Sequence, residues 1–163
     1  MSEIGGMRQQ AQLTRNVVRL NLEGISHEQS LIQPKPAGNC SNWVVGHLVA
    51  VYNQVLPLLG QTPVESAGDL ARYARGSSAL TRASDAVPLP DLVSGWEEAC
   101  VRVDAGLAAL PPRRLEMLVP DSPTGDPDET LGSLLAVALF HQAYHAGQLG
   151  ILRRIAGESG AIA

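Results

Sequence analysis

The chain of 163 residues is poor in aromatic side chains, lysine and cysteine, and each shortage limits what it can be. Aromatic residues make up 4% of it, so its core must come from Leu, Val and Ala, which favours helices over sheets. Two cysteines, Cys40 and Cys100, are too few for a disulfide framework. Lys and Arg number 12, scattered along a chain of net charge −4, and this argues against a nucleic-acid partner.

Long hydrophobic runs are also missing. The longest uncharged apolar stretches, 134–140 and 44–52, fall well short of the roughly 18 residues that span a bilayer. Residues 1–10 lack the apolar core of a signal peptide. We therefore expect a cytoplasmic protein without membrane contact. Hydrophobic residues reach 45% and charged residues 17%, which excludes a disordered chain and fits one globular domain over 1–163.

Four helical segments are predicted by apolar residues that recur three and four positions apart. Their expected ranges are about 7–23, 41–60, 91–110 and 130–156. The third carries the clearest amphipathic stripe, which runs from Leu92 through Trp96 and Cys100 to Leu110. No strand pattern of comparable strength competes with them, so the sequence predicts an all-α fold, a four-helix bundle.

Residues that typically begin or end helices support these ranges. Ser41 is the expected N-cap of the second helix and Thr130 that of the fourth. Gly60 and Gly157 are expected stops, and Pro57 should disturb the end of the second helix. The connection of about 30 residues between the second and third helices is long enough for a crossover that leaves those two helices parallel.

Three of the four histidines fall on apolar helix faces. His141 and His145 are four residues apart, a spacing that places both rings on one face, together with Leu134 and Leu149. His47 interrupts the apolar stripe of the second helix. Three histidines with an open fourth position are the ligand pattern of catalytic zinc, and nickel, iron or manganese also suit imidazole. The alternative is a set of packed core histidines, each with hydrogen-bond partners.

Other residues near these histidines carry weaker expectations. Gln142 stands where the H-E-x-x-H metalloprotease helix needs Glu, so that class is excluded. Gln148 is a candidate to orient a histidine, or else a surface amide. Tyr144 and Trp43 are expected to pack in the core, with Trp43 as a possible wall of the site. His27 is interpreted as an exposed polar residue.

Further polar residues are interpreted as structural. Cys40 lies just before a helix, where the helix dipole can lower the pKa of a thiol, so a nucleophilic role for it stays open. Cys100 should pack as a small hydrophobic residue. Glu97 and Glu98 are expected in solvent. Gly147, like Gly150 on the same helix, suggests a close helix contact, one version of which is a subunit interface.

Two segments resemble a known group of proteins. Residues 41–48, SNWVVGHL, resemble the W-x-x-x-H-L region of the DinB/YfiT-like metalloenzyme superfamily. Residues 141–149, HQAYHAGQL, resemble its last helix, which typically has the pattern H-x-x-x-H-x-G-Q. The resemblance implies a four-helix bundle of up-down-down-up topology and a divalent metal held by His47, His141 and His145.

The resemblance also implies an activity. Characterised members of that superfamily are thiol transferases that use mycothiol or bacillithiol, and a thiol-dependent maleylpyruvate isomerase, and members are often homodimers. It therefore implies a metal-dependent S-transferase or isomerase that activates a low-molecular-weight thiol at zinc or nickel, or at iron or manganese. Ala146 departs from the pattern, since many relatives carry Arg there, and no acidic residue matches a general base.

Three functions stay open from the sequence. The first is this metal-dependent enzyme, including a near variant that hydrolyses with an activated water. The second is a non-catalytic metal- or ligand-binding protein of a stress response. The third is an interaction module in which the histidines merely pack.

Overall fold

The computed structural model describes residues 2–80, 82–120 and 122–162, and the regular secondary structure in these ranges is helical. The α-helices are α1 (Glu3–Leu22), α2 (His27–Ser30), α3 (Ser41–Val55), α4 (Leu89–Ala109) and α5 (Leu131–Ile155). The 3₁₀ turns are η1 (Leu56–Leu59), η2 (Ala71–Tyr73), η3 (Ala83–Asp85) and η4 (Pro112–Glu116). Within those ranges no strand forms beyond one isolated bridge between Leu118 and Thr130. The prediction of an all-α fold is confirmed.

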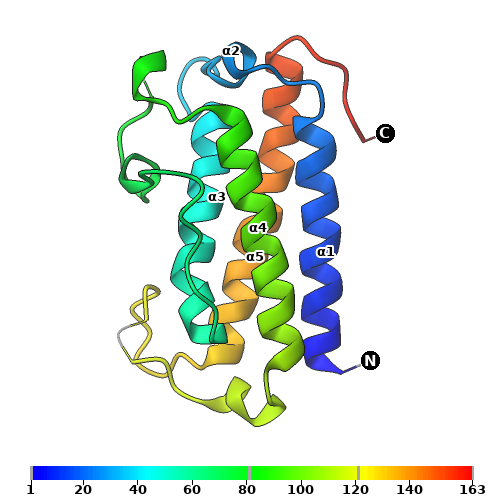
Figure 1. The fold of residues 1–163 in the computed structure, drawn as a ribbon, viewed down its shortest axis with the longest axis vertical. Helices are drawn as coiled ribbons and strands as arrows, with labels where there is room; N and C mark the ends of the chain where they lie inside the picture. The colour runs from blue at the N-terminus through cyan, green and yellow to red at the C-terminus, as the bar shows by residue number, and fades with distance from the viewer. Residues whose placement is uncertain (1, 81, 121, 163) are drawn as a thin grey trace.

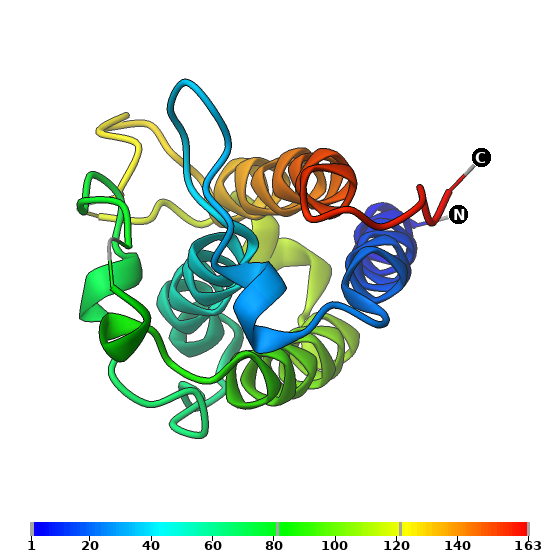
Figure 2. The same cartoon turned by 90° about the horizontal axis from the view of Figure 1, so that it is seen from above.

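The four long helices lie side by side around one core (Figures 1 and 2). α1 packs against α4 and α5, and α3 packs against the same two helices from the other side. In Figure 1, α1 and α5 run upward while α3 and α4 run downward. The connection from Gly60 to Pro88 climbs back along α3, which is why α3 and α4 point the same way.

The helix ends follow the sequence closely, with two corrections. Ser41 is not the N-cap of α3: Cys40 has the extended backbone of a cap, and Ser41 is already the first helical residue. α1 begins at Glu3 rather than near residue 7, because the Ser2 hydroxyl accepts from the Gly5 amide and caps the helix there. The expected cap at Thr130 is confirmed: its hydroxyl accepts from the Ser133 amide.

The ends of α3 and α5 show why glycine predicted the ends of these helices. α3 gives way to the 3₁₀ turn η1, which contains Pro57, and the chain then turns at Gly60 with φ +72°. Gly157 follows α5 with φ +91°. Both values lie in the left-handed region that glycine adopts without steric cost.

The core is built mainly from aliphatic side chains, as the low aromatic content requires. The stripe predicted on α4 is buried along its whole length; its members are Leu92, Trp96, Cys100, Val103, Leu107 and Leu110. α3 is buried almost all round, because η2 and its flanking residues cover the face that α4 and α5 leave free.

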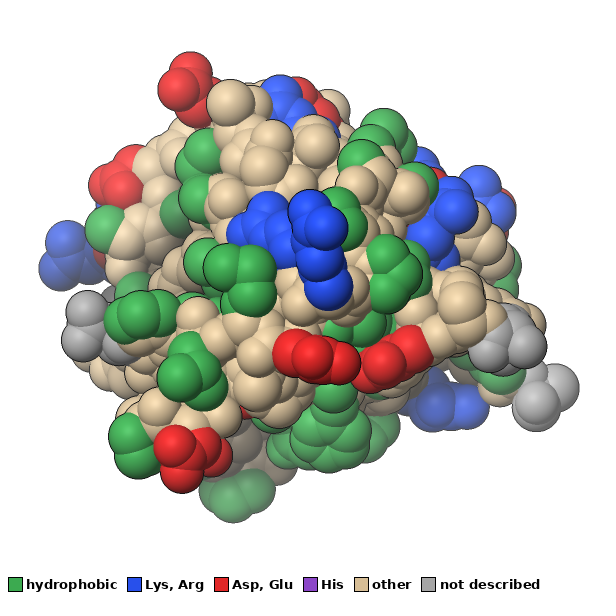
Figure 3. Space-filling view, turned by 90° about the horizontal axis from the view of Figure 1, so that it is seen from below, with side chains coloured by type: hydrophobic (Ala, Val, Ile, Leu, Met, Phe, Trp, Pro, Cys, Tyr) green, Lys and Arg blue, Asp and Glu red, His purple; other side chains and the backbone are tan. Residues whose placement is uncertain are grey.

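The surface is mixed in character. Figure 3 shows one end of the molecule, where acidic and basic side chains of the described residues are interspersed among apolar ones. Among the helices of the described ranges, none is long and apolar enough to cross a membrane.

Candidate metal centre

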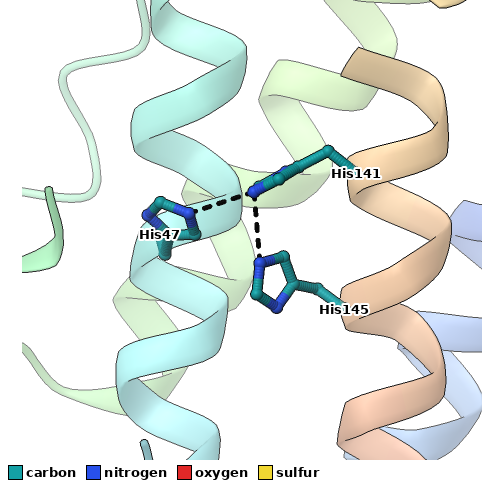
Figure 4. Close-up of side chains that lie close together, drawn as sticks. All are labelled: His47, His141 and His145. Atoms are coloured by element: carbon teal, nitrogen blue, oxygen red, sulfur yellow. Dashed lines mark hydrogen bonds between the residues drawn. The ribbon is translucent and has the colours of Figure 1, made fainter. Parts of the chain in front are cut away.

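Three histidines from two helices meet between α3 and α5 (Figure 4). His47 Nε2 lies 3.1 Å from His141 Nε2, and His145 Nε2 lies 3.2 Å from the same atom. One ligand atom from each ring falls within 4.8 Å of the other two. Nothing but the fold brings His47 here, since it lies 94 residues before His141 in the chain.

The helices explain how the rings converge. α3 and α5 pack against each other, and His47 lies on the face of α3 that meets α5. His141 and His145 are one turn apart on α5 and project from the same side of it, as their spacing predicts. His47 is buried, while His141 and His145 are half-buried, so the cluster sits at the edge of the core.

The outer nitrogens of two rings fix where their lone pairs point. His47 Nδ1 donates to the carbonyl oxygen of Tyr73 at 2.7 Å, and a carbonyl can only accept. His145 Nδ1 donates to Gln148 Oε1 at 2.8 Å. A neutral imidazole carries one proton, so both Nε2 atoms are left with lone pairs that face His141. This is the form in which histidine binds a metal.

Hydrogen bonding alone cannot satisfy such a cluster. His141 Nε2 has at most one proton to share between two inward-facing lone pairs. Its other nitrogen, Nδ1, is buried and has no hydrogen-bond partner among the described residues. A divalent cation accepts all three lone pairs at once, and three imidazole nitrogens are a common donor set for zinc and related metals. The residues present therefore fit a metal ion.

The electrostatics keep these rings neutral. Burial lowers the pKa of His47 and of His145, in each case against a hydrogen bond that raises it. For His141, burial together with the charges of His145, His47 and Arg75 lowers the pKa to about 4. Neutral rings at physiological pH are ready to bind a cation, because a metal ligand must first lose its proton.

The connection between α3 and α4 supplies a partner that the sequence did not reveal. Tyr73 in η2 is buried; its hydroxyl donates to Asn42 Oδ1 at 3.0 Å and accepts from the Val87 amide at 2.8 Å. Its ring lies flat against α3 at Gly46, where a Cβ atom would come within 2.4 Å of it. This packing puts the Tyr73 carbonyl beside His47.

Only one feature of the sequence could have pointed to this contact. Gly46 is a glycine inside a helix, next to a candidate ligand, and such a glycine costs about 1 kcal/mol relative to alanine. A cost of that size is a sign of close approach by another segment. Which segment approaches depends on the path of residues 61–88, and that path has no periodic pattern to predict it.

Two neighbours of the histidines were predicted correctly and one was not. Gln148 orients His145, as proposed for it. Trp43 is buried and also stacks on His47, with ring centroids 4.7 Å apart, so it both packs and walls the site. Tyr144 is not packed in the core: its side chain is exposed and meets only the edge of His145.

The remaining polar candidates lie elsewhere. Gln142 points into the core, where its amide donates to the Leu48 carbonyl at 3.1 Å. Glu97 pairs with Arg15, and Glu98 with Arg102, so neither lines the histidine cluster. His27 is not simply exposed: it is half-buried, and its Nδ1 accepts from an α4 backbone amide at 3.2 Å.

Both cysteines are free and buried. Burial raises the pKa of the Cys40 thiol, despite its place at the start of α3, and it raises that of Cys100 as well. Each thiol is therefore protonated at neutral pH, which is the opposite of what a nucleophilic cysteine needs.

The two glycines proposed for a close contact on α5 behave differently. Gly150 is packed against the side chain of Asn21 on α1, with 3.4 Å available for a Cβ atom. Asn21 in turn donates to the Ala146 carbonyl at 3.0 Å, so this contact lies within the chain. Gly147 has nothing within 4 Å and faces outward.

The sequence and the fold of the chain can be compared with those of known proteins. No curated protein sequence matches the chain. Among solved structures, a conserved protein from Enterococcus faecalis shares the fold, with a TM-score of 0.74 over 95% of this chain and 97% of that one, at 15% sequence identity. The model of the mycothiol S-transferase family matches residues 8–157, a range that contains all three clustered histidines. The chain thus belongs to the mycothiol S-transferases, a DinB/YfiT-like family.

Proposed function

We propose that this protein is a metal-dependent thiol S-transferase in which His47, His141 and His145 hold a divalent cation. The observation that carries the proposal is the convergence of three Nε2 atoms, two of them with their lone pairs turned inward by outer hydrogen bonds. Family membership supports a thiol as the nucleophile. Zinc or nickel, and after them iron or manganese, suit three imidazoles with a free position.

A cation held by these imidazoles lowers the pKa of a thiol or water that takes its remaining position. The chain itself contributes orientation and a dry surface. The Tyr73 carbonyl and Gln148 fix two of the rings, and a cavity of about 560 Å³ opens beside His47 and His141. Most residues that line this cavity are aliphatic or proline, which limits competing water.

The transfer needs no oxidant and balances simply. The thiol gives up its proton, its sulfur forms a bond to an electrophilic carbon, and the bond from that carbon to the leaving group breaks with its electron pair going to the leaving group. The products are a thioether, the leaving group with its electron pair, and a proton. No carboxylate occurs among the described residues that line the cavity, so the proton passes to solvent.

The test starts from protein purified without a histidine tag or a nickel column, because such a column can load the site. We expect about one divalent ion per chain, and a thiol-dependent conversion of monochlorobimane with mycothiol that stops when the metal is removed. His141→Ala should lose both the metal and the conversion, whereas His27→Ala should keep both. Metal without conversion would favour the non-catalytic binding protein, and absence of metal would favour packed histidines.

The proposal includes the architecture and the compartment. We assign residues 1–163 to a single domain with the up-down-down-up four-helix bundle of the superfamily, supported by the directions of α1, α3, α4 and α5. Two free cysteines suit the reducing cytoplasm, which is where we place the protein.

A homodimer is the assembly we propose. Hydrophobic side chains spaced three, four and seven residues apart form an exposed stripe on α5; they are Val137, Phe140, Tyr144 and Ile151. The outward-facing Gly147 lies in the same stripe and would let a second helix approach closely. Light scattering should give twice the chain mass, and Phe140→Glu should return it to the monomer value.

A further inference from the structure

The cavity beside the histidines is mainly apolar, and Arg75 is the one Arg or Lys among the described residues that line it. It lies between α3, α5, the turn after η2 and residues 119, 120, 123 and 124, all on the same side of the bundle (Figures 1 and 2). Its apolar lining consists of Ala50, Val51, Val55, Leu58, Ala74, Val119, Pro120, Pro123, Leu134, Val137 and Ala138. Gln54 and Thr124 add neutral polar groups, and Arg75 is the cation.

Arg75 is a cation without a counter-charge in this cavity. Among the described residues that line it, there is no Asp or Glu and no other Arg or Lys. The ion pairs formed by the described part of the chain use Arg8, Arg15, Arg102 and Arg153, not Arg75. Arg75 is exposed, so a ligand that enters the cavity can reach its guanidinium, whose planar fork binds a carboxylate through two hydrogen bonds.

The backbone holds Arg75 in a defined place. Residues 74–77 form a tight turn closed by the Ser77 amide, which donates to the Ala74 carbonyl at 3.0 Å, and Gly76 takes the left-handed position with φ +80°. The Ser77 hydroxyl accepts from Trp43 Nε1 at 3.0 Å and donates to the Arg72 carbonyl at 2.7 Å. The turn is thus fastened to the tryptophan that stacks on His47.

The same segment therefore serves the site twice. Tyr73 orients His47 through its carbonyl, and Arg75, two residues later, lines the cavity in front of that histidine. We propose that Arg75 binds an anionic group of the substrate, so that the enzyme selects molecules with an apolar body and a carboxylate or similar anion. The inference takes the proposed function as its basis and names its substrate class.

A matched pair of electrophiles tests this selection. 4-(Chloromethyl)benzoate and 4-(chloromethyl)benzamide differ in charge but hardly in size, and each reacts with a thiol to give the benzyl thioether, chloride and a proton. For the zinc-loaded wild type with mycothiol, we expect kcat/KM to favour the benzoate by about 10- to 100-fold, the range of a charge-assisted hydrogen bond. Arg75→Gln should abolish this preference while leaving the amide within about threefold.

Arg72→Gln is the matched control, because Arg72 lies in η2 and does not line the cavity. It should retain the wild-type preference. A preference that is lost equally in Arg72→Gln overturns the proposal, and one that survives in Arg75→Gln shows that Arg75 does not bind the anion of the electrophile.

The anion can belong to the electrophile or to the thiol. A second arm therefore keeps the neutral amide as electrophile and compares N-acetylcysteine with N-acetylcysteine amide. If Arg75→Gln slows only N-acetylcysteine, Arg75 binds the anion of the thiol, and the proposal holds in that form. If Arg75→Gln changes neither pair, it fails.

Binding without turnover separates the two proposals. 4-Methylbenzoate and 4-methylbenzamide are unreactive, and calorimetry of each with zinc-loaded and metal-free protein reports on Arg75 alone. We expect the benzoate to bind more tightly to both forms of wild type, and this advantage to vanish in Arg75→Gln. If no thiol is ever transferred, the proposed function fails, yet this measurement still decides on Arg75. If the advantage persists in Arg75→Gln but disappears with the metal, the ion holds the anion and the inference is wrong.

Discussion

The two sides of the candidate metal centre are built in different ways. On the α5 side, His141 and His145 come from adjacent turns of one helix, and the partner of His145, Gln148, lies one further turn along. On the α3 side, His47 depends on the Tyr73 carbonyl, 26 residues later, in a connection whose described residues form only short 3₁₀ turns. One side is therefore local and the other tertiary.

This difference separates the spacing of the histidine side chains, which a helix sets, from the orientation of a ring, which depends on tertiary contacts. A helix sets the spacing of its side chains by its own geometry, so α5 presents two nitrogens wherever it forms. Orientation of the third ring instead requires that Tyr73 stay against α3, which depends on the hydrogen bonds of its hydroxyl and on the gap at Gly46. We infer that damage to the connection should weaken the α3 side first.

The largest expected effect removes a ligand from either side. His47→Ala and His141→Ala should each weaken zinc binding by more than about 100-fold, beyond the 10- to 100-fold typical of the residues that orient ligands. The cause is common to both, because two imidazoles and solvent do not replace three nitrogens. Calorimetric titration of zinc into metal-free protein measures it.

His27→Ala serves as the control, since His27 only accepts a backbone hydrogen bond at the start of α4. Its zinc affinity should equal that of the wild type, with a small loss of stability. If His47→Ala bound zinc as tightly as the wild type while His141→Ala did not, the site would reduce to a chelate on α5, and the comparison drawn above would collapse.

A glycine on each side provides the next test. Gly46→Ala places a Cβ atom 2.4 Å from the Tyr73 ring, so the connection must move; we expect a loss of about 1–3 kcal/mol of stability and weaker zinc binding. Gly147→Ala on α5 meets nothing within 4 Å in its own chain, so in the monomeric Phe140→Glu background it should gain about 0.5–1 kcal/mol from helix propensity. Urea unfolding with and without zinc measures both. Equal stability of the two variants would show that the packing of the Tyr73 ring does not depend on the missing side chain at Gly46.

The same contrast explains how far the sequence could predict the molecule. Helix periodicity gave the four long helices and the ligand pair on α5, and the interruption of a stripe gave His47. Caps were predictable to within a residue or two, as the shift from Ser41 to Cys40 shows. Tyr73 and Arg75 could not be found, because their roles depend on where an aperiodic connection folds back.

The exposure of Tyr144 was missed for a related reason. Its neighbour in the sequence, His145, faces inward, and a residue one position away on a helix points about 100° off that direction. Whether that direction is core or solvent depends on which helices flank α5, and α1 and α3 leave this face open. The periodicity of a sequence predicts which residues share a helix face, but it does not predict which other helices pack against that face.

A pH titration of the metal-free protein probes both sides together. The folded-state pKa of His141 is lowered to about 4, and those of His47 and His145 are lowered too, with burial as the first cause. Below pH 6.5, the unfolded chain therefore binds more protons at these histidines than the folded chain does. Stability should be fully present above pH 6.5 and fall as pH drops from 6.5 toward 4.

Urea midpoints at several pH values measure this decline. His141→Leu should decline less than the wild type, because one buried ring that must stay neutral has been removed. Parallel curves for the two proteins would contradict the assignment. Zinc should delay the decline in the wild type, since binding to the folded state stabilises it until protons displace the metal.

The smallest expected effect concerns Gln148, the local counterpart of the Tyr73 carbonyl. Gln148→Leu removes the acceptor of the His145 Nδ1 proton and should weaken zinc binding about tenfold, the low end of the range for such partners. The effect is small because Gln148 is only half-buried and water can take over as acceptor. Gln148→Glu keeps an acceptor and should bind zinc at least as well as the wild type. A loss in Gln148→Leu as large as that in Gly46→Ala would mean that the local side needs outside support as much as the tertiary one.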